Sequence, residues 1–133
     1  NRIHVINLED FLVTHIPIGS NPRAIVLSPD NTKMYVTMNL SGKVASWDLS
    51  ANKAGKSVKT GEAARSLAIS SDGSTMFVVN FKSNTMSKVR TSDMKVLETI
   101  KACNEPIGVT YDAPTGNTWV ACYKGQIKIY SNN

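Results

Sequence analysis

The chain has 133 residues, of which 41% are hydrophobic and 19% are charged, so it is neither disordered nor fibrous and fits one globular domain. No apolar run approaches the roughly 18 residues that a membrane-spanning helix needs. The net charge of +5 comes from basic residues scattered along the chain, which is typical of a solvated surface rather than a dedicated anion site.

Short strands with turn residues between them are expected along the whole chain, without any helical periodicity. In chain order they are 2–8 and 11–18, then 24–28, 33–38, 43–48 and 57–60, then 66–70, 75–80, 85–90 and 96–100, and finally 108–112, 118–122 and 126–130. Turns such as Pro29-Asp30-Asn31 and Ser71-Asp72-Gly73 separate the first two strands of each set. The pattern predicts an all-β fold of thirteen strands.

The same residue types return at a fixed spacing of 41 or 42 residues. Large side chains recur at Tyr35, Phe77 and Trp119, each followed by valine, and again at Ile6, Trp47, Val89 and Tyr130. A period of roughly 40–45 residues with four strands per unit is typical of β-propeller blades. We expect Tyr35, Trp47 and Trp119 to pack between blades, because they fall at these repeat positions.

Several segments resemble the YVTN-repeat (WD-like) β-propeller family. Residues 21–30 look like that family's opening strand and turn, and Phe77-Val78-Val79-Asn80 is similar to its Tyr-Val-Thr-Asn motif. The segment 35–39 resembles the same motif with Met38 inserted, and 119–122 departs from it by losing the Asn. The resemblance implies blades of four antiparallel strands, in a fold that serves enzymes, binding modules and surface proteins alike.

The repeat phase predicts a single partial propeller of about three blades over residues 1–133. Residues 1–20 would end one blade, 21–61 and 62–103 would form two blades, and 104–133 an incomplete final blade. We expect a fragment or part of a larger or assembled ring, with a processed N-terminus and Asn133 near the natural C-terminus. Further blades would come from the same parent chain or from a second copy.

The resemblance places the loops between units, and those between second and third strands, on one face around a central channel, where a ligand would bind. The candidate ligand-binding residues are Arg23, Asn39, Glu62, Arg65, Phe81, Lys82, Glu105, Tyr123 and Lys124. Two arginines at one repeat position, with lysines and aromatic rings nearby, suit a carboxylate, phosphate or sugar acid. Alternatively, Arg23 and Arg65 are structural and pair with acidic loop residues, since a repeated residue often serves the repeat itself.

Cys103 and Cys122 are expected at the same rim of one blade. They either form a disulfide, which would favour a secreted, periplasmic or cell-surface setting, or remain two free thiols. His4 and His15 lie on outer strands and are expected in surface or packing roles. The sequence contains no motif for a metal or a cofactor, and none is expected.

We therefore expect a non-catalytic binding or scaffold propeller of a bacterial or archaeal protein, with a protein or glycan ligand on its channel face. Part of a lactonase-like or cofactor-binding propeller enzyme is one alternative. A basic module that binds single-stranded nucleic acid is the other, motivated by the net charge.

Overall fold

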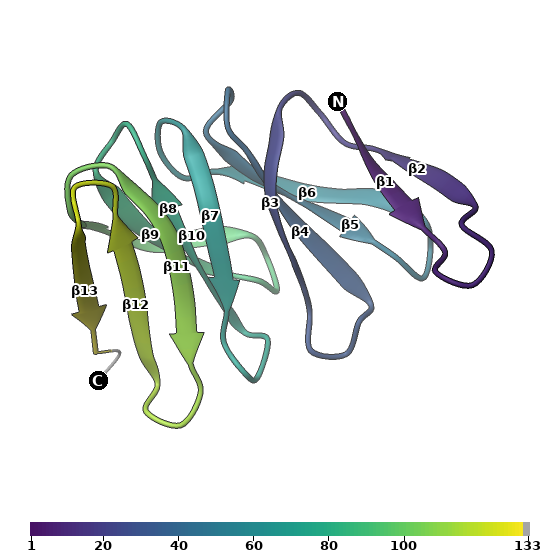
Figure 1. Ribbon diagram of the computed structural model, residues 1–133. Helices are drawn as coiled ribbons and strands as arrows, with labels where there is room; N and C mark the ends of the chain where they lie inside the picture. Colours follow the sequence, from purple (N-terminus) through teal and green to yellow (C-terminus); the bar gives the residue numbers. More distant parts are fainter. Residues whose placement is uncertain (132–133) are drawn as a thin grey trace.

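The computed structural model describes residues 1–131, which form thirteen β-strands in four antiparallel sheets stacked side by side (Figure 1). Sheet 1 contains β1 (Arg2–Ile6) and β2 (Val13–Pro17), and sheet 2 contains β3 (Pro22–Leu27), β4 (Lys33–Met38), β5 (Lys43–Asp48) and β6 (Lys53–Lys59). Sheet 3 contains β7 (Ala64–Ile69), β8 (Thr75–Asn80), β9 (Thr85–Arg90) and β10 (Lys95–Lys101), and sheet 4 contains β11 (Pro106–Asp112), β12 (Asn117–Cys122) and β13 (Gln126–Tyr130). The predicted all-β class and strand order are confirmed. Residues 1–131 include no helix that could cross a membrane.

The first strands of sheets 2, 3 and 4 begin two residues earlier than the sequence predicted. In each, the register with the second strand shifts near the start, between Pro22 and Ile25 in sheet 2 for example. A bulge adds one residue to a strand, so the alternation of apolar and polar residues is interrupted there and the residues before it do not continue the pattern. The predicted starts therefore mark the bulge and not the true end of the strand.

The hairpin of sheet 1 is shorter than expected, because its turn fixes its own backbone. The Asn7 side chain accepts the Glu9 N–H at 2.8 Å, and the Asp10 side chain accepts the Leu12 N–H at 3.0 Å. Such local bonds favour a turn over a ladder. The strands therefore stop at Ile6 and resume at Val13.

An apolar cluster fills the space between each pair of neighbouring sheets. Met34, Val36 and Trp47 of sheet 2 pack against Ile16 of sheet 1. Two further clusters join sheet 2 to sheet 3 and sheet 3 to sheet 4: they are Tyr35, Val44, Ala64, Leu67, Met76, Val78, Val89 and Met94, and Phe77, Val79, Met86, Ala102, Cys103, Val120 and Cys122. Second strands β4 and β8 are buried on both faces, so this stacking supplies most of the apolar burial.

The aromatic repeat residues behave alike only where a neighbouring sheet covers them. Tyr35 and Trp47 are 3% and 7% exposed, and Phe77 stacks on Tyr111 of sheet 4 with ring centroids 5.8 Å apart. Trp119 occupies the equivalent position in sheet 4 but is 38% exposed. The expected packing of Trp119 is therefore absent within residues 1–131, because no further sheet lies on that face.

We expect this open face to drive self-association of a polypeptide of residues 1–133. Trp119 and its cross-strand neighbour Ile129 share the face, and both are exposed. Contiguous exposed apolar side chains favour association. Sedimentation velocity over a concentration series should show larger species that Trp119→Ser reduces. Leu40→Ser, which removes an exposed apolar side chain elsewhere, should leave the distribution unchanged; an equal effect of both would contradict the assignment.

Two turns between first and second strands are held by the same polar network. In sheet 2 the Ser28 hydroxyl donates to Asp30 at 2.5 Å, and the Thr32 N–H donates to the same carboxylate oxygen at 3.0 Å. Asp72 accepts the matching bonds in sheet 3. The serine hydroxyl, then the backbone N–H two residues on, lowers the pKa of each carboxyl from 3.8 to about 2.

These two carboxyls make stability depend on pH in the acid range. Because the pKa in the folded chain, about 2, lies below the ordinary 3.8, the contribution is complete above pH 3.8 and is lost as pH falls towards about 2. We expect the urea midpoint to drop over this interval. In the Asp30→Asn/Asp72→Asn double variant the drop should be smaller, and an unchanged slope would show that other groups cause it.

A disulfide joins Cys103, in the segment that leads into sheet 4, to Cys122 at the end of β12, with Cα atoms 6.0 Å apart. Both residues are buried against sheet 3. The bond closes a loop with a sequence separation of 19, which restricts the unfolded chain. We expect reduction to lower the free energy of unfolding by about 3 kcal/mol, measured by urea denaturation with and without reductant. Identical curves would contradict this.

Candidate binding rim between sheets 2 and 3

Each junction between sheets is tied to the loop that follows the second strand of the next sheet. One residue per junction has left-handed backbone, with φ of 59°, 55° and 54° at Asn21, Ala63 and Glu105. Its carbonyl accepts the N–H of the first loop residue at 3.0 Å, from Asn39, Phe81 and Tyr123 respectively. These loops and junctions form one rim, which repeats at each sheet.

The repeat also corrects one interpretation of the sequence. Met38 is the last residue of β4 and pairs with Lys43, just as Asn80 ends β8 and pairs with Thr85. Met38 therefore takes the place of Asn80 and is not an insertion. Asn39 belongs to the rim loop, where its side-chain amide donates to the Ala64 carbonyl of sheet 3 at 3.2 Å.

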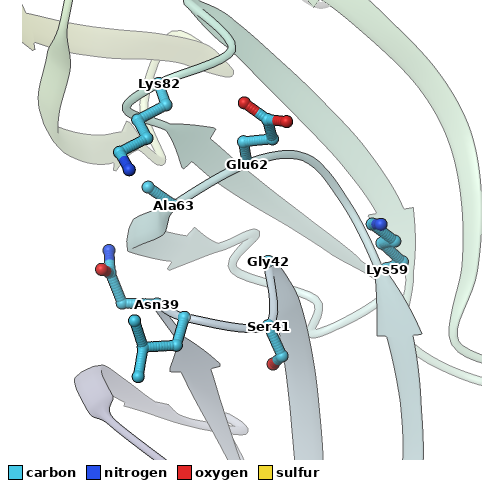
Figure 2. Close-up of a pocket in the computed structure, with 8 residues that line it drawn as sticks. Asn39, Ser41, Gly42, Lys59, Glu62, Ala63 and Lys82 are labelled. Atoms are coloured by element: carbon cyan, nitrogen blue, oxygen red, sulfur yellow. The ribbon is translucent and has the colours of Figure 1, made fainter.

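A cavity of about 350 Å³ opens in the rim between sheets 2 and 3 (Figure 2). It is lined by Asn39, Leu40, Ser41, Gly42, Lys59, Glu62, Ala63 and Lys82. These residues come from the β4–β5 loop, from the end of β6 and the junction after it, and from the β8–β9 loop. Both flanking sheets have all four strands, so the cavity lies within the most complete part of the described chain.

A close backbone approach shapes the floor of this cavity. The Gly42 carbonyl accepts the Thr60 N–H at 2.9 Å, which draws the β4–β5 loop against the junction. A Cβ on Gly42 would lie 2.2 Å from the Gly61 carbonyl oxygen, and Gly42 has a φ of +63°. Only glycine combines that backbone conformation with so short a distance.

Three charged side chains surround the cavity without pairing to one another. Figure 2 shows the Glu62 side chain between those of Lys82 and Lys59, with its carboxylate directed away from both ammonium groups. Within residues 1–131 one pair of oppositely charged side chains lies within 4 Å: Arg90 and Asp93, which are 2.6 Å apart and do not line this cavity. The backbone holds the charges in place, because the Lys82 N–H donates to the Glu62 carbonyl at 3.2 Å and the Glu62 N–H donates to the Ser83 hydroxyl at 2.7 Å. The cavity thus presents a positive, negative, positive sequence of charges.

The structure brings together three of the nine predicted ligand-binding residues, namely Asn39, Glu62 and Lys82. Arg65 and Phe81 lie beside the cavity, with the guanidinium carbon 4.7 Å from the ring centroid. Glu105, Tyr123 and Lys124 belong to the corresponding loops of sheet 4, and Arg23 is exposed on β3.

The alternative role suggested for the two arginines is not observed. Within residues 1–131 neither Arg23 nor Arg65 forms an ion pair with an acidic side chain. Arg65 instead packs on Phe81, a cation–π contact that keeps its charge near the rim.

The sequence prediction missed five residues of the cavity, of which Lys59 matters most for charge. Lys59 ends β6, a strand that was predicted to run over 57–60, so its place beside the junction was readable from that prediction. Leu40, Ser41 and Gly42 follow Asn39 in the loop, and Ala63 follows Glu62. The signal was therefore position in the repeat rather than residue type.

Across residues 1–131 no three His, Cys, Asp or Glu side chains converge in an arrangement that could hold a metal ion.

Comparison with known proteins identifies the fold. The chain superposes on Kuenenia stuttgartiensis hydrazine synthase with a TM-score of 0.81 and 22% identity, over 84% of this chain and 32% of that one. The structure of the RRP9 WD40 repeats gives 0.79 and 14% identity, over 87% and 37% of the two chains. The fold is that of a partial β-propeller. Each four-stranded sheet is thus a propeller blade.

Dihydro-heme d1 dehydrogenase NirN, in complex with DHE, is similar to 98% of this chain and matches over 32% of its own length, with a TM-score of 0.79 and 18% identity. The chain therefore spans about a third of each of these propeller proteins. No family model and no curated protein matches the sequence. Membership of the YVTN-repeat family stays a prediction.

Proposed function

We propose that this chain is part of a non-catalytic binding propeller, which takes a protein ligand at the rim cavity between sheets 2 and 3. The observation that carries the proposal is the positive, negative, positive charge sequence of Lys82, Glu62 and Lys59. The backbone groups that join the rim loops to the junctions are hydrogen-bonded within the protein. The three charged side chains, in contrast, form no ion pair within residues 1–131. The similarity to a WD40-repeat structure supports a propeller whose rim is available to a protein ligand.

The charge sequence favours a ligand with the opposite pattern. An acidic, basic, acidic stretch of polypeptide can place a carboxylate near each lysine and an ammonium or guanidinium near Glu62. Asn39 and Ser41 also line the cavity. The Asn39 amide donates to the Ala64 carbonyl and the Ser41 hydroxyl to the Met38 carbonyl, which leaves their oxygen atoms as acceptors for the N–H groups of a peptide. The nearby Arg65 adds positive charge that attracts an acidic partner.

The proposal is tested with a capped Glu-Arg-Glu peptide, followed by amide chemical shifts of the protein. We expect shifts concentrated at the cavity, and loss of binding in the Lys82→Glu variant. Lys124→Glu is the matched control, because Lys124 holds the same repeat position in sheet 4 outside the cavity. A capped Arg-Glu-Arg peptide should bind more weakly.

Equal loss in the two variants, or no preference between the peptides, would contradict a specific site. Binding of an oligogalacturonate but of neither peptide would favour a glycan ligand. Salt-dependent binding of single-stranded oligothymidine would favour the nucleic-acid alternative. A lactonase-like or cofactor-binding enzyme would require a cluster of carboxylate, His and Asn side chains at the mouth of the channel.

We also propose that the protein works in an oxidising setting, at the cell surface, in the periplasm or outside the cell. The Cys103–Cys122 disulfide supports this, because such bonds persist mainly in those compartments. Mass spectrometry of the protein from its native source, alkylated in denaturant before reduction and with a second label after reduction, tests it. Labelling of both cysteines before reduction would contradict it.

A further inference from the structure

The two histidines of the chain meet on the hairpin of sheet 1. His4 in β1 and His15 in β2 are direct cross-strand partners in the antiparallel register. Their ring centroids lie 4.5 Å apart with an interplanar angle of 66°. Both rings are exposed, in line with the surface role that the sequence predicted, and the register places them beside one another.

The pair lies on the face of the hairpin that points away from the core. The preceding cross-strand pair, Ile3 and Ile16, packs against sheet 2, and successive residues of a strand point to opposite faces. Both His4 and His15 are exposed, and within residues 1–131 no hydrogen bond to either ring is formed. The ring nitrogens are therefore open to an incoming ligand.

We propose that His4 and His15 form a surface binding site for a transition-metal ion of the Cu²⁺ type. Imidazole nitrogen is a preferred donor for Cu²⁺, which accepts tetragonal sites completed by water or other oxygen donors. Two neighbouring donors at about 2 Å from one ion lie roughly 3 Å apart. Rings 4.5 Å apart on adjacent strands reach that spacing by side-chain rotation, without movement of the backbone.

The charge beside the pair bears on which ion the site would take. Arg2 lies close enough to His15 for its positive charge to act on the imidazole, and it repels a metal cation. The site is therefore expected to favour ions with high imidazole affinity over Ca²⁺ or Mg²⁺.

The test is a titration of the protein with CuCl₂ in a buffer that contains no nitrogen donor. The paramagnetic resonance spectrum should show nitrogen coupling from two imidazoles. His4→Asn and His15→Asn should each weaken binding by roughly tenfold or more, since each leaves a single donor in place of a chelating pair. Thr14→Asn should leave it unchanged, because Thr14 lies on the same strand and faces the other way.

Far-ultraviolet circular dichroism of each variant separates lost binding from lost structure. Copper affinity in the His4→Asn/His15→Asn double variant equal to that of the unmodified protein would overturn the proposal, because the chain has no other histidine. A spectrum with one coupled nitrogen in the unmodified protein would overturn it too.

Discussion

Replacing Gly42 with alanine is expected to lower the free energy of unfolding by about 4 kcal/mol, from left-handed backbone strain together with steric overlap. The new Cβ would meet the Gly61 carbonyl oxygen at 2.2 Å and the Gly61 carbonyl carbon at 3.1 Å. Both atoms are backbone, and the neighbouring Thr60 N–H donates to the Gly42 carbonyl and holds the two segments together, so the Gly61 atoms cannot move aside cheaply.

Gly125→Ala is the matched control for this change. Gly125 also has a positive φ, of +82°, but a Cβ there would meet nothing within 4 Å. Its cost should be about 1 kcal/mol, the backbone contribution alone. Urea denaturation of both variants measures the difference. Similar losses would mean that the close approach to Gly61 has no energetic weight.

Replacing Asn80 with leucine is expected to cost about 4 kcal/mol, because it removes the hydrogen-bond partner of three hydroxyl groups, of which Ser87 is buried and Thr60 and Thr85 are half-buried. The side chain is fully buried, and its amide donates to Thr85 and Ser87, both at 3.0 Å. Its carbonyl oxygen accepts the Thr60 hydroxyl at 2.9 Å, which ties the end of sheet 2 to sheet 3. Leucine has a similar volume but replaces none of these bonds.

Met38→Leu tests the same repeat position in sheet 2, where the residue is already apolar. A volume-conserving change there should cost about 1 kcal/mol. If Asn80→Leu does not fold, Thr60→Val removes one donor of the network and should cost about 1–2 kcal/mol. Equal losses at positions 38 and 80 would contradict the role of the polar network.

The sequence predicted the strands well because the residues that recur in the repeat are apolar side chains that pack in the core. Second strands such as β4 and β8 have the predicted bounds, since their apolar residues are buried on both faces. The predicted range 57–60 for the outer strand β6 is too short, because its exposed lysines give no alternation of apolar and polar residues. Lysines on an outer strand keep the edge of the sheet from pairing with another chain.

The candidate site was less predictable, for a physical reason. The repeat indicates which loops share a rim, and it therefore predicts Asn39, Glu62 and Lys82 as residues of the site. Gly42 joins them through the approach of its backbone to Gly61, a tertiary contact that the repeat spacing does not indicate. The pairing of His4 with His15 likewise depends on the register of the hairpin. The spacing of the two residues in the sequence does not distinguish this register from one shifted by a single residue.

The left-handed residues of the rim have an evolutionary consequence. Asn21, Ala63 and Glu105 differ chemically, yet each anchors its junction through a main-chain carbonyl. Selection can therefore exchange the side chains at one junction without disturbing the frame there or at the next. Such a protein can acquire a new specificity one junction at a time, so that a single ring carries several independent recognition surfaces.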